Sequence, residues 1–465
     1  MKPKIDRSSI AAIFGASIFY ILFAYDLERT DWMKLLGYYS LLFLISFHLF
    51  QKFGHNLKKL SYIAFGFRAI FIFAIPNLSQ DFYRFIWDGQ MILNGFNPYL
   101  YTPISFFEQG NFPFEYANKL YHGMGSLSAN NYTNYPPVNQ LLFTLAGLFY
   151  GKQLLSSVIG LRLIIIAADF GVLHYGRKLL KRLALPEKHI FFYILNPFII
   201  IELTGNLHFE GVMIFFLIWS LYLLHKGSWI KAAIVLALSI STKLIPLILL
   251  PLFWQWFTKR ASSTALREEK SHTSTYFLKR FSKLTAFYAI VSFVNMFLFL
   301  PFFSKEFITN YSKTVGLWFG KFEFNASIYY IVREIGYTFR GYNEIEIIGR
   351  YIPIIVIIVL LILTFFRKNR NLKELMTSML LGLTIYFFLS TTVHPWYIAT
   401  LLLLSVFTKY RFPLVWSFIV IISYLAYLNS NNSENLWIIG LEYLIVYSYF
   451  IWEVFMKPKR AVTFN

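Results

Sequence analysis

Cysteine is absent from the 465 residues of this chain. Disulfide scaffolds, thiolate metal sites and cysteine nucleophiles are therefore excluded. Charged residues are scarce as well, at 14% of the sequence, whereas hydrophobic residues make up 57% and aromatic residues alone 20%. Because apolar segments recur from end to end, this composition predicts an all-α, polytopic membrane helical bundle and excludes a soluble multidomain protein.

Several machineries for handling substrates are missing too. The sequence has no glycine-rich phosphate loop of the Walker or dinucleotide type, and no soluble domain large enough to hold a nucleotide-sugar. An activated substrate would therefore have to come from the membrane itself. Asp81 and Asp88 could bind a hard cation, but two acids at this spacing are a weak metal pattern, so no cofactor is predicted.

Positive charge is in excess, with a net charge of +20. The basic residues cluster in short loops between apolar segments, which is typical of membrane topology rather than of a nucleic-acid-binding face. The expected partner is therefore the lipid bilayer and not nucleic acid. The first apolar stretch continues into acidic residues without a small-residue cleavage site, so no cleavable signal peptide is expected.

The apolar segments predict about 12–14 membrane-spanning helices. The segments are 10–27, 35–50, 61–76, 155–175, 190–203, 209–225, 229–242, 244–257, 283–303, 351–366, 374–390, 396–408, 412–428 and 436–455. The last two before the connector 258–282, namely 229–242 and 244–257, could be one broken helix. The connector is charged and rich in Ser and Thr, which predicts a solvated cytoplasmic loop.

The apolar run 138–150 decides the topology. Pro136-Pro137 precedes it and Gly151-Lys152 follows it, so it is short for a span. If it lies along the surface, every strongly basic loop falls on one side of the membrane, as the positive-inside rule requires. We therefore expect cytoplasmic termini, a plasma (inner) membrane location, and outer-face loops over 77–137 and 304–350.

The stretch 81–93 has the spacing of an amphipathic surface helix that Gly95 ends. Asp81, Arg84 and Asp88 share one face, which is expected to point toward water. The apolar residues of the opposite face are Phe82, Phe85, Ile86, Gly89, Ile92 and Leu93.

A carboxylate at the mouth of a hydrophobic cavity could deprotonate an acceptor hydroxyl. Asp81 is closer to the preceding span than Asp88 is, so Asp81 is the preferred catalytic base and Asp88 the second candidate. The alternative is an ordinary surface helix whose acids face water or pair with Arg84.

Nearly all the unusual polar clusters fall on the outer face. A transporter would be expected to place ionisable residues near the bilayer midplane, so the pattern favours an enzyme. Lys243, His208, His394, Arg84 and Arg162 are candidate ligands for a donor phosphate, because cations stabilise a leaving phosphate. Lys243 could instead snorkel to the interface, and a turn histidine could be structural. The candidate substrate-binding residues are Asn97, Tyr99, Tyr135, Asn206, Glu210, Asn325, Trp396 and Tyr397.

Six motifs in order resemble the polytopic GT-C glycosyltransferases, particularly the bacterial polyprenol-phosphate-mannose-dependent mannosyltransferases. There is a more distant likeness to the first mannosyltransferase of GPI-anchor synthesis. The resemblance covers roughly residues 60–400. The motifs are QDFYRFIWDGQMILNGFNPYLYTP, NYPPVNQLLF, NPFIIIELTGNLHFEGVMIFF, LSISTKLIPLILLP, FEFNASIYYIV and HPWY.

The resemblance implies an essential aspartate in the first large outer loop, surface helices over a lipid-binding cavity, and a sugar donor carried on a polyprenyl phosphate. By position the aspartate corresponds to Asp81, with Asp88 second, and Tyr135-Pro136-Pro137 precedes the surface helix. Many members have paired acids at this point, whereas here Gln80 precedes Asp81.

The chain is accordingly divided into four parts. Residues 1–60 hold two additional N-terminal helices, and 61–257 form the GT-C-like module with the outer loop 77–154 and its surface helices. The cytoplasmic connector 258–282 follows, and 283–465 holds the C-terminal helices with the outer loop 304–350.

The predicted function is the transfer of a sugar, with inversion of configuration, from a polyprenyl-phosphate donor to a glycolipid or glycan acceptor at the outer face. The resemblance to the family implies that this sugar is mannose. Two alternatives stay open: a flippase or transporter for a lipid-linked saccharide, and a transferase for a pentose or aminoarabinose, or one that ligates whole glycans.

Overall fold

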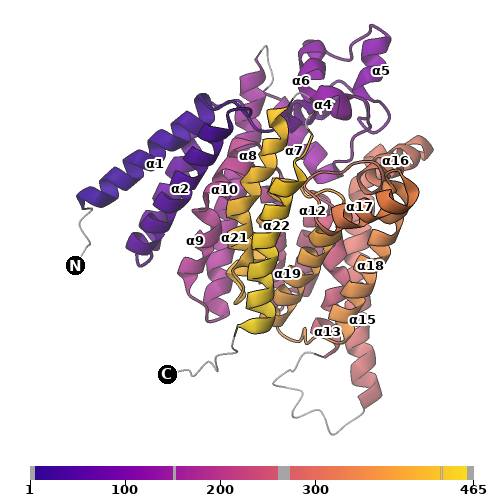
Figure 1. Ribbon diagram of the computed structural model, residues 1–465. Helices are drawn as coiled ribbons and strands as arrows, with labels where there is room; N and C mark the ends of the chain where they lie inside the picture. The colour runs from indigo at the N-terminus through magenta and orange to yellow at the C-terminus, as the bar shows by residue number, and fades with distance from the viewer. Residues whose placement is uncertain (1–5, 150–152, 260–272, 430, 432, 458–465) are drawn as a thin grey trace.

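The computed structural model describes residues 6–149, 153–259, 273–429, 431 and 433–457. This part of the chain is helical, apart from one isolated β-bridge between Phe324 and Thr392. Upright helices lie side by side in one bundle, and a group of short helices covers one end (Figure 1). The all-α polytopic fold predicted from composition is confirmed.

Fourteen helical regions coincide with the fourteen predicted spans, but fewer qualify as full crossings. Within the described residues, 7 helices are long and apolar enough to cross a membrane, or up to 8 if the bent pair Pro197–Gly205 and Glu210–His225 forms one span. The other apolar regions consist of shorter helices, because Pro246, Pro251 and similar residues interrupt them.

Two helices form the N-terminal hairpin, α1 (Arg7–Tyr25) and α2 (Trp32–Phe53). The Asp31 side chain accepts a hydrogen bond from the backbone N–H of Lys34 and so caps α2. The hairpin leans against α3 (Leu57–Ile70) at one flank of the bundle (Figure 1).

The first half of the bundle is built around α8 (Leu154–Arg182), α11 (Glu210–His225) and α12 (Trp229–Ile240), which pack together. The connecting elements are η1 (Glu187–Ile190), α9 (Phe191–Ile194), α10 (Pro197–Ile199), η2 (Ile200–Gly205), η3 (Ile245–Leu252) and α13 (Phe253–Thr258).

The second half of the bundle follows the connector, whose residues 260–272 lie outside the described residues. The span predicted from 283 begins earlier, because α15 starts at Thr273. The predicted outer loop 304–350 is largely helical. The elements are α15 (Thr273–Phe299), η4 (Leu300–Phe302), α16 (Lys305–Gly320), α17 (Ile328–Arg340), α18 (Ile345–Phe365), α19 (Leu372–Leu389), η5 (Pro395–Tyr397), α20 (Ile398–Val406), α21 (Phe412–Ile419), η6 (Val420–Leu428), α22 (Leu436–Ile451) and η7 (Trp452–Met456).

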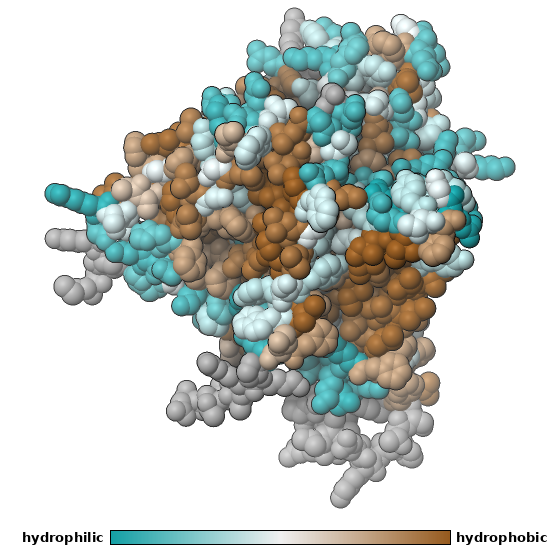
Figure 2. Space-filling model, viewed as in Figure 1, coloured by the Kyte–Doolittle hydropathy of each residue, from teal (hydrophilic) through white to brown (hydrophobic). Residues whose placement is uncertain are grey.

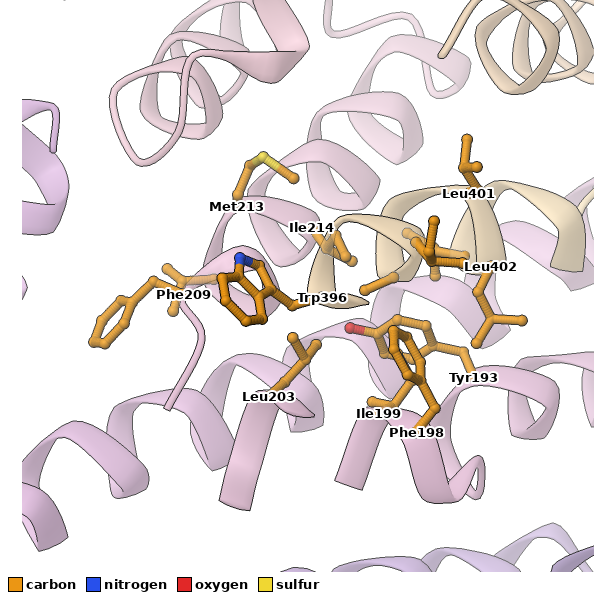
Figure 3. Packing of buried hydrophobic residues seen from close by; sticks show 14 of the residues in the cluster. Tyr193, Phe198, Ile199, Leu203, Phe209, Met213, Ile214, Trp396, Leu401 and Leu402 are labelled. Atoms are coloured by element: carbon orange, nitrogen blue, oxygen red, sulfur yellow. The ribbon is translucent and has the colours of Figure 1, made fainter. Parts of the chain in front are cut away.

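Buried apolar side chains fill the space between the two halves. Figure 3 shows Tyr193 and Phe198 from the α9–α10 region and Met213 from α11, facing Leu401 of α20 across this core. The surface of the upright helices is strongly hydrophobic, whereas hydrophilic residues gather over the covering helices at one end (Figure 2). This distribution is what a bilayer around the bundle requires.

Four helices form a cap at one end of the bundle: α4 (Asp81–Leu93), α5 (Pro103–Glu108), α6 (Ala117–Ala129) and α7 (Pro137–Gly147). The predicted surface helix after Pro136-Pro137 is therefore present. Gly89 of α4 is in close contact with α7, since a Cβ there would lie 2.4 Å from the carbonyl oxygen of Phe143. Only a glycine allows the two helices to approach this closely.

The bounds of α4 agree with the prediction, but its polar face does not point toward water. Arg84 is 4% exposed and Asp88 is fully buried, because α6 and α7 pack against the face that the pattern assigns to solvent. Gly95, with a φ of 80°, follows the end of the helix as expected.

Candidate active site

Asp81 is the first residue of α4, and its backbone N–H donates to Ser79 Oγ over 3.3 Å. Its side chain is partly buried. Removal from water raises the pKa of the Asp81 carboxyl to about 6, the nearby Lys243 cation opposes this rise, and the Glu210 carboxylate adds to it. A carboxyl with a pKa near neutrality is suited to accept a proton during a reaction.

Lys243 and Glu210 form an ion pair beside Asp81. Lys243 Nζ, in the turn after α12, lies 2.8 Å from Glu210 Oε1, in the first turn of α11. The Glu210 side chain is fully buried, whereas that of Lys243 remains 18% exposed. The ammonium group is therefore neutralised on its inner side and open on its outer side.

Tyr135 joins this group from the segment before α7. Its ring lies 5.2 Å from Lys243 Nζ and packs edge-on against Phe85 of α4. Burial raises the pKa of the Tyr135 hydroxyl well above its usual value, and the charge of Asp81 adds to the rise. The phenol therefore stays protonated and can donate a hydrogen bond.

Two predicted histidines are brought together through a tryptophan. The ring of Trp396 stacks on that of His208, with ring centres 3.6 Å apart, and on that of His394, with ring centres 4.5 Å apart. Burial and the positive charge of Lys243 lower the pKa of His394 to about 3. His394 is therefore a neutral ring rather than a cation near pH 7.

The stack changes the roles open to Trp396. Since the Trp396 ring already stacks on two histidine rings, less of its surface is open for a sugar to stack on. Figure 3 shows Trp396 between Phe209 and the core residue Leu203. Its neighbour Tyr397 carries a hydroxyl within electrostatic range of Asp81 and Glu210. Tyr397 is therefore the better placed of the two to contact a substrate.

The break between η2 and α11 holds the segment that leads into Asp81. The chain bends by 114° here, and Leu207 adopts a φ of 64°. Asn206 Oδ1 accepts a hydrogen bond from the backbone N–H of Leu78 over 3.2 Å. Asn206 thus positions residues 77–81 rather than standing free for a ligand.

Arg84 and Asp88 are engaged within the cap. Arg84 Nε donates to Asp88 Oδ1 over 2.7 Å, and Arg84 Nη1 donates to the carbonyls of Ser128 and Asn131. Gln140 of α7 donates to the other oxygen of Asp88 over 3.1 Å. This network ties α4 to α6 and α7, which explains why these two residues are buried.

Arg162, predicted as a phosphate ligand, is enclosed by backbone carbonyls. Its guanidinium is fully buried in the described structure. The four hydrogen-bond acceptors are the carbonyls of Ile72 (3.0 Å), Ala74 (2.6 Å), Thr204 (2.9 Å) and Gly205 (2.9 Å). These carbonyls lie at the ends of α3 and η2, so Arg162 satisfies backbone groups that two helix ends leave unpaired.

Asn97 and Tyr99 join the cap to the second half of the bundle. The Asn97 side chain donates to the carbonyl of Phe302 over 3.1 Å. The Tyr99 hydroxyl donates to the carbonyl of Tyr135 over 2.6 Å, and the Tyr99 ring is fully buried. Both residues therefore hold the wall of the site in place.

Asn325 is hydrogen-bonded to the C-terminal part of the chain. Its backbone N–H donates to Glu434 over 2.6 Å, its side chain donates to Glu442 over 3.2 Å, and its carbonyl accepts from Tyr443 over 2.7 Å. These contacts attach Asn325 to α22 and the loop before it. The ring of its neighbour Phe324 stacks on that of His394, with ring centres 5.2 Å apart.

An apolar groove lies next to the site, between α15, η4 and α16, with a volume of about 620 Å³. Its walls are Phe293, Asn295, Met296, Phe297, Phe299, Leu300, Phe303, Phe307 and Tyr311. The Tyr99 ring packs against Phe299 and Tyr311. Because the Tyr99 hydroxyl binds Tyr135, one residue separates the end of the groove from the polar group around Asp81.

Residues that the sequence analysis missed also surround the site. The Arg29 guanidinium carbon lies 3.9 Å from the centre of the Tyr427 ring. Glu202 in η2 is fully buried, accepts from the Tyr424 hydroxyl at 3.0 Å, and lies 3.8 Å from His208 Nε2. Arg29 could have been noticed as a cation in a turn that the sequence analysis assigns to the outer side, where the positive-inside rule disfavours one.

No group of three or more His, Asp or Glu residues in the described ranges could hold a metal ion.

Comparisons with known proteins agree with the motifs. Residues 33–259 match a family described as alpha-(1->6)-mannopyranosyltransferase, N-terminal domain. The chain is 22% identical over 351 residues to alpha-(1->6)-mannopyranosyltransferase A of Corynebacterium glutamicum, with 71% of this chain and 67% of the relative covered. It is 21% identical over 343 residues to the protein of that name from Mycobacterium tuberculosis, with 70% and 60% covered. The match thus spans about two thirds of one relative and less of the other.

Proposed function

We propose that this chain, which its motifs and relatives identify as a GT-C mannosyltransferase-like membrane protein, transfers a mannosyl group from a polyprenyl-phosphate donor to a hydroxyl of a glycolipid or glycan acceptor. The observation that carries the proposal is the partly buried Asp81 carboxyl, whose pKa is raised to about 6, beside the Lys243–Glu210 ion pair.

A lipid-linked donor fits the surroundings of this group. The apolar groove beside Tyr99 is lined by aromatic and aliphatic side chains, and most of these are exposed on the hydrophobic surface of the bundle. A prenyl chain is the kind of ligand such a groove accommodates, because a groove open to the lipid can take up an apolar chain directly from the bilayer and hold it by van der Waals packing. The end of the groove near Tyr99 would then bring the phosphate of the same molecule toward Lys243.

Asp81 would act as the general base. It accepts the proton of the acceptor hydroxyl while the hydroxyl oxygen attacks the anomeric carbon, and the bond from that carbon to the phosphate oxygen breaks. The electron pair leaves with the polyprenyl phosphate. Because attack and departure occur on opposite faces of the sugar, this single displacement inverts the configuration and turns a β-linked donor into an α-linked product.

Lys243 would stabilise the leaving phosphate as a point charge on its exposed side. Glu210 holds the ammonium from its buried side and thereby fixes its position. The neutral His394 ring and the Tyr135 hydroxyl can donate hydrogen bonds to the sugar or the phosphate. His208, deeper in the stack, would support the Trp396 ring that His394 rests on.

The outer face is the proposed side of the reaction. The first turn of α1 and the end of α22 lie at the end of the bundle away from α4–α6 (Figure 1). The basic loops favour the cytoplasm for that end. Asp81 and the cap then face the outside of the plasma membrane, where a lipid-linked donor and a glycan acceptor can meet.

The test uses the full chain purified into lipid nanodiscs, labelled polyprenyl-phosphate mannose, and a membrane glycolipid extract. Transfer of label by wild type, lost in Asp81→Asn and retained in the surface variant Asp26→Asn, is the expected result. Asp26 is exposed and pairs with Lys34 in the α1–α2 turn, so it controls for the loss of a carboxylate. Relocation of the labelled lipid without a new product would instead indicate a flippase, and transfer only from a pentose or aminoarabinose donor would correct the sugar.

A further inference from the structure

The turn between α1 and α2 carries a cation whose charge no acid of the described residues neutralises. In this turn Lys34 pairs with Asp26 at 3.0 Å and with Asp31 at 3.5 Å. Arg29 forms no ion pair with a carboxylate among the described residues and is half-buried. A half-buried guanidinium without a counter-ion is unusual, because removing a charge from water is costly unless it is paired.

Arg29 is nevertheless held in a fixed place. Its guanidinium stacks on the Tyr427 ring at 3.9 Å, and Nη1 lies 3.5 Å from the carbonyl oxygen of Leu78, at the limit of a hydrogen bond. A stacked guanidinium keeps its N–H groups at its edge. Most of the five donors of Arg29 are therefore oriented but not used by the protein.

The position of Arg29 brings it to the same site as Asp81. Leu78 and Asp81 belong to one short segment, which Asn206 binds through the Leu78 N–H. The Asn77 side chain anchors this segment to the hairpin by donating to the carbonyls of Phe23 and Leu27 over 2.7 and 2.9 Å. The Tyr427 hydroxyl lies within electrostatic range of both Arg29 and Asp81.

The charge balance of the site calls for one more cation. Lys243 is already neutralised by Glu210, and the ionised Asp81 carries a further negative charge until it accepts the proton. A phosphodiester donor brings one further negative charge, and the departing phosphate monoester gains another. Two cations whose positions are fixed before the reaction stabilise such a leaving group far better than one cation that is shared with a carboxylate.

We propose that Arg29, supplied by the N-terminal hairpin and oriented by Tyr427, binds the phosphate of the lipid-linked donor as a second cation besides Lys243. This inference rests on the proposed function. It assigns a substrate-binding role to a turn that precedes the region matched by the family, which begins at residue 33. The planar fork of arginine suits two phosphate oxygens at once.

The test compares Arg29→Ala, Arg29→Gln and Arg29→Lys with wild type in nanodiscs. The matched control is Lys58→Ala, because Lys58 also lies over a tyrosine ring, that of Tyr62 at 5.8 Å, but at the start of α3. We expect Arg29→Ala to raise the donor KM and the inhibition constant of free polyprenyl phosphate by about tenfold or more, and to leave the acceptor KM within about twofold. The donor KM of Arg29→Lys should lie between those of wild type and Arg29→Ala, and that of Lys58→Ala should match wild type.

A binding measurement separates this inference from the proposed function. Polyprenyl phosphate in nanodiscs should raise the melting temperature of wild type and of Lys58→Ala, but much less that of Arg29→Ala, whether or not transfer is observed. If wild type transfers no sugar while this difference holds, the proposed function fails and the phosphate site remains. The inference would be overturned if folded Arg29→Gln had the same donor KM as wild type and the same rise in melting temperature with polyprenyl phosphate. It would also be overturned if inorganic phosphate alone raised the melting temperature of wild type as much as polyprenyl phosphate does. Should Arg29→Ala and Arg29→Gln fail to fold, Arg29→Lys decides, because it keeps the charge but loses the fork.

Discussion

The ammonium group of Lys243 lies 2.8 Å from the carboxylate of Glu210, which is fully buried at the start of α11. The two residues come from turns at adjacent helix ends, and Asp81 lies close enough to feel both charges. The ion pair thereby links the packing of the bundle to the protonation of the proposed base.

The pair should be required for folding and catalysis in separable ways. Lys243→Met leaves a buried Glu210 carboxylate unpaired and should lower the unfolding free energy by about 3–5 kcal/mol. The double variant Lys243→Met/Glu210→Gln removes the orphaned charge and should recover much of that loss without recovering transfer. Thermal unfolding in nanodiscs together with transfer rates measures both effects. A double variant as active as wild type would rule out the proposed role of Lys243.

Asp81→Asn should lower kcat by about 10²–10⁴-fold, the range for a general base, with little change in donor KM. Its thermal stability should equal or exceed that of wild type, because burial disfavours the charged carboxylate that the amide replaces. Initial rates over a range of donor concentrations and a melting curve test these expectations together. A variant that loses activity only because it unfolds would contradict them.

The pH dependence of kcat/KM should rise through about pH 6 and level off above it, because Asp81 accepts a proton only when ionised. Glu210→Gln removes a charge that raises the pKa of Asp81, so the rising limb should move to lower pH. Lys243→Met removes a charge that lowers this pKa and should move the limb to higher pH. Unchanged limbs in both folded variants would show that Asp81 does not control the profile.

Arg162→Met should destabilise the protein by about 3 kcal/mol or more, since four backbone carbonyls lose their donor. Because the guanidinium faces these carbonyls, the donor KM of the folded fraction should stay close to that of wild type. Melting temperature and donor KM measured at low temperature separate the two effects. A raised donor KM at full stability would restore Arg162 as a phosphate ligand.

Gly89→Ala should weaken both the cap and the activity. The new Cβ would lie 2.4 Å from the carbonyl oxygen of Phe143, so α4 must move away from α7 and carry Asp81 with it. Gly66→Ala in α3 is the control, because nothing lies within 4 Å of a Cβ there. Protease sensitivity of the cap and the transfer rate should change in the first variant and not in the second.

Local periodicity predicted the helices well and their faces poorly. The spacing of apolar residues and the glycine at position 95 gave the bounds of α4. Asp88 was nevertheless assigned to solvent, because a single helix pattern contains no information on whether α6 and α7 will pack on its polar side. The hydrogen bond from Gln140 to Asp88 joins residues far apart in the chain.

The sequence predicted only part of the candidate site, because it identifies polar residues but not the partners that they contact. Lys243, Glu210, Tyr135 and His208 were singled out because they belong to unusual polar clusters in an apolar chain, and for Glu210 and His208 also because charge is costly to bury in a short turn between two spans. Arg162 carries the same signal, yet it serves helix ends rather than a ligand. Burial cost identifies residues that need a partner, but it does not say whether the partner is a substrate or the backbone.

Composition and apolar patterning by themselves determined that this chain is a helical membrane protein with a polar cap at one end, because both properties are local and additive along the sequence. Only the tertiary structure decided that residues 29, 81, 243 and 427 surround one place, since contacts between distant segments depend on how helices pack and not on their periods.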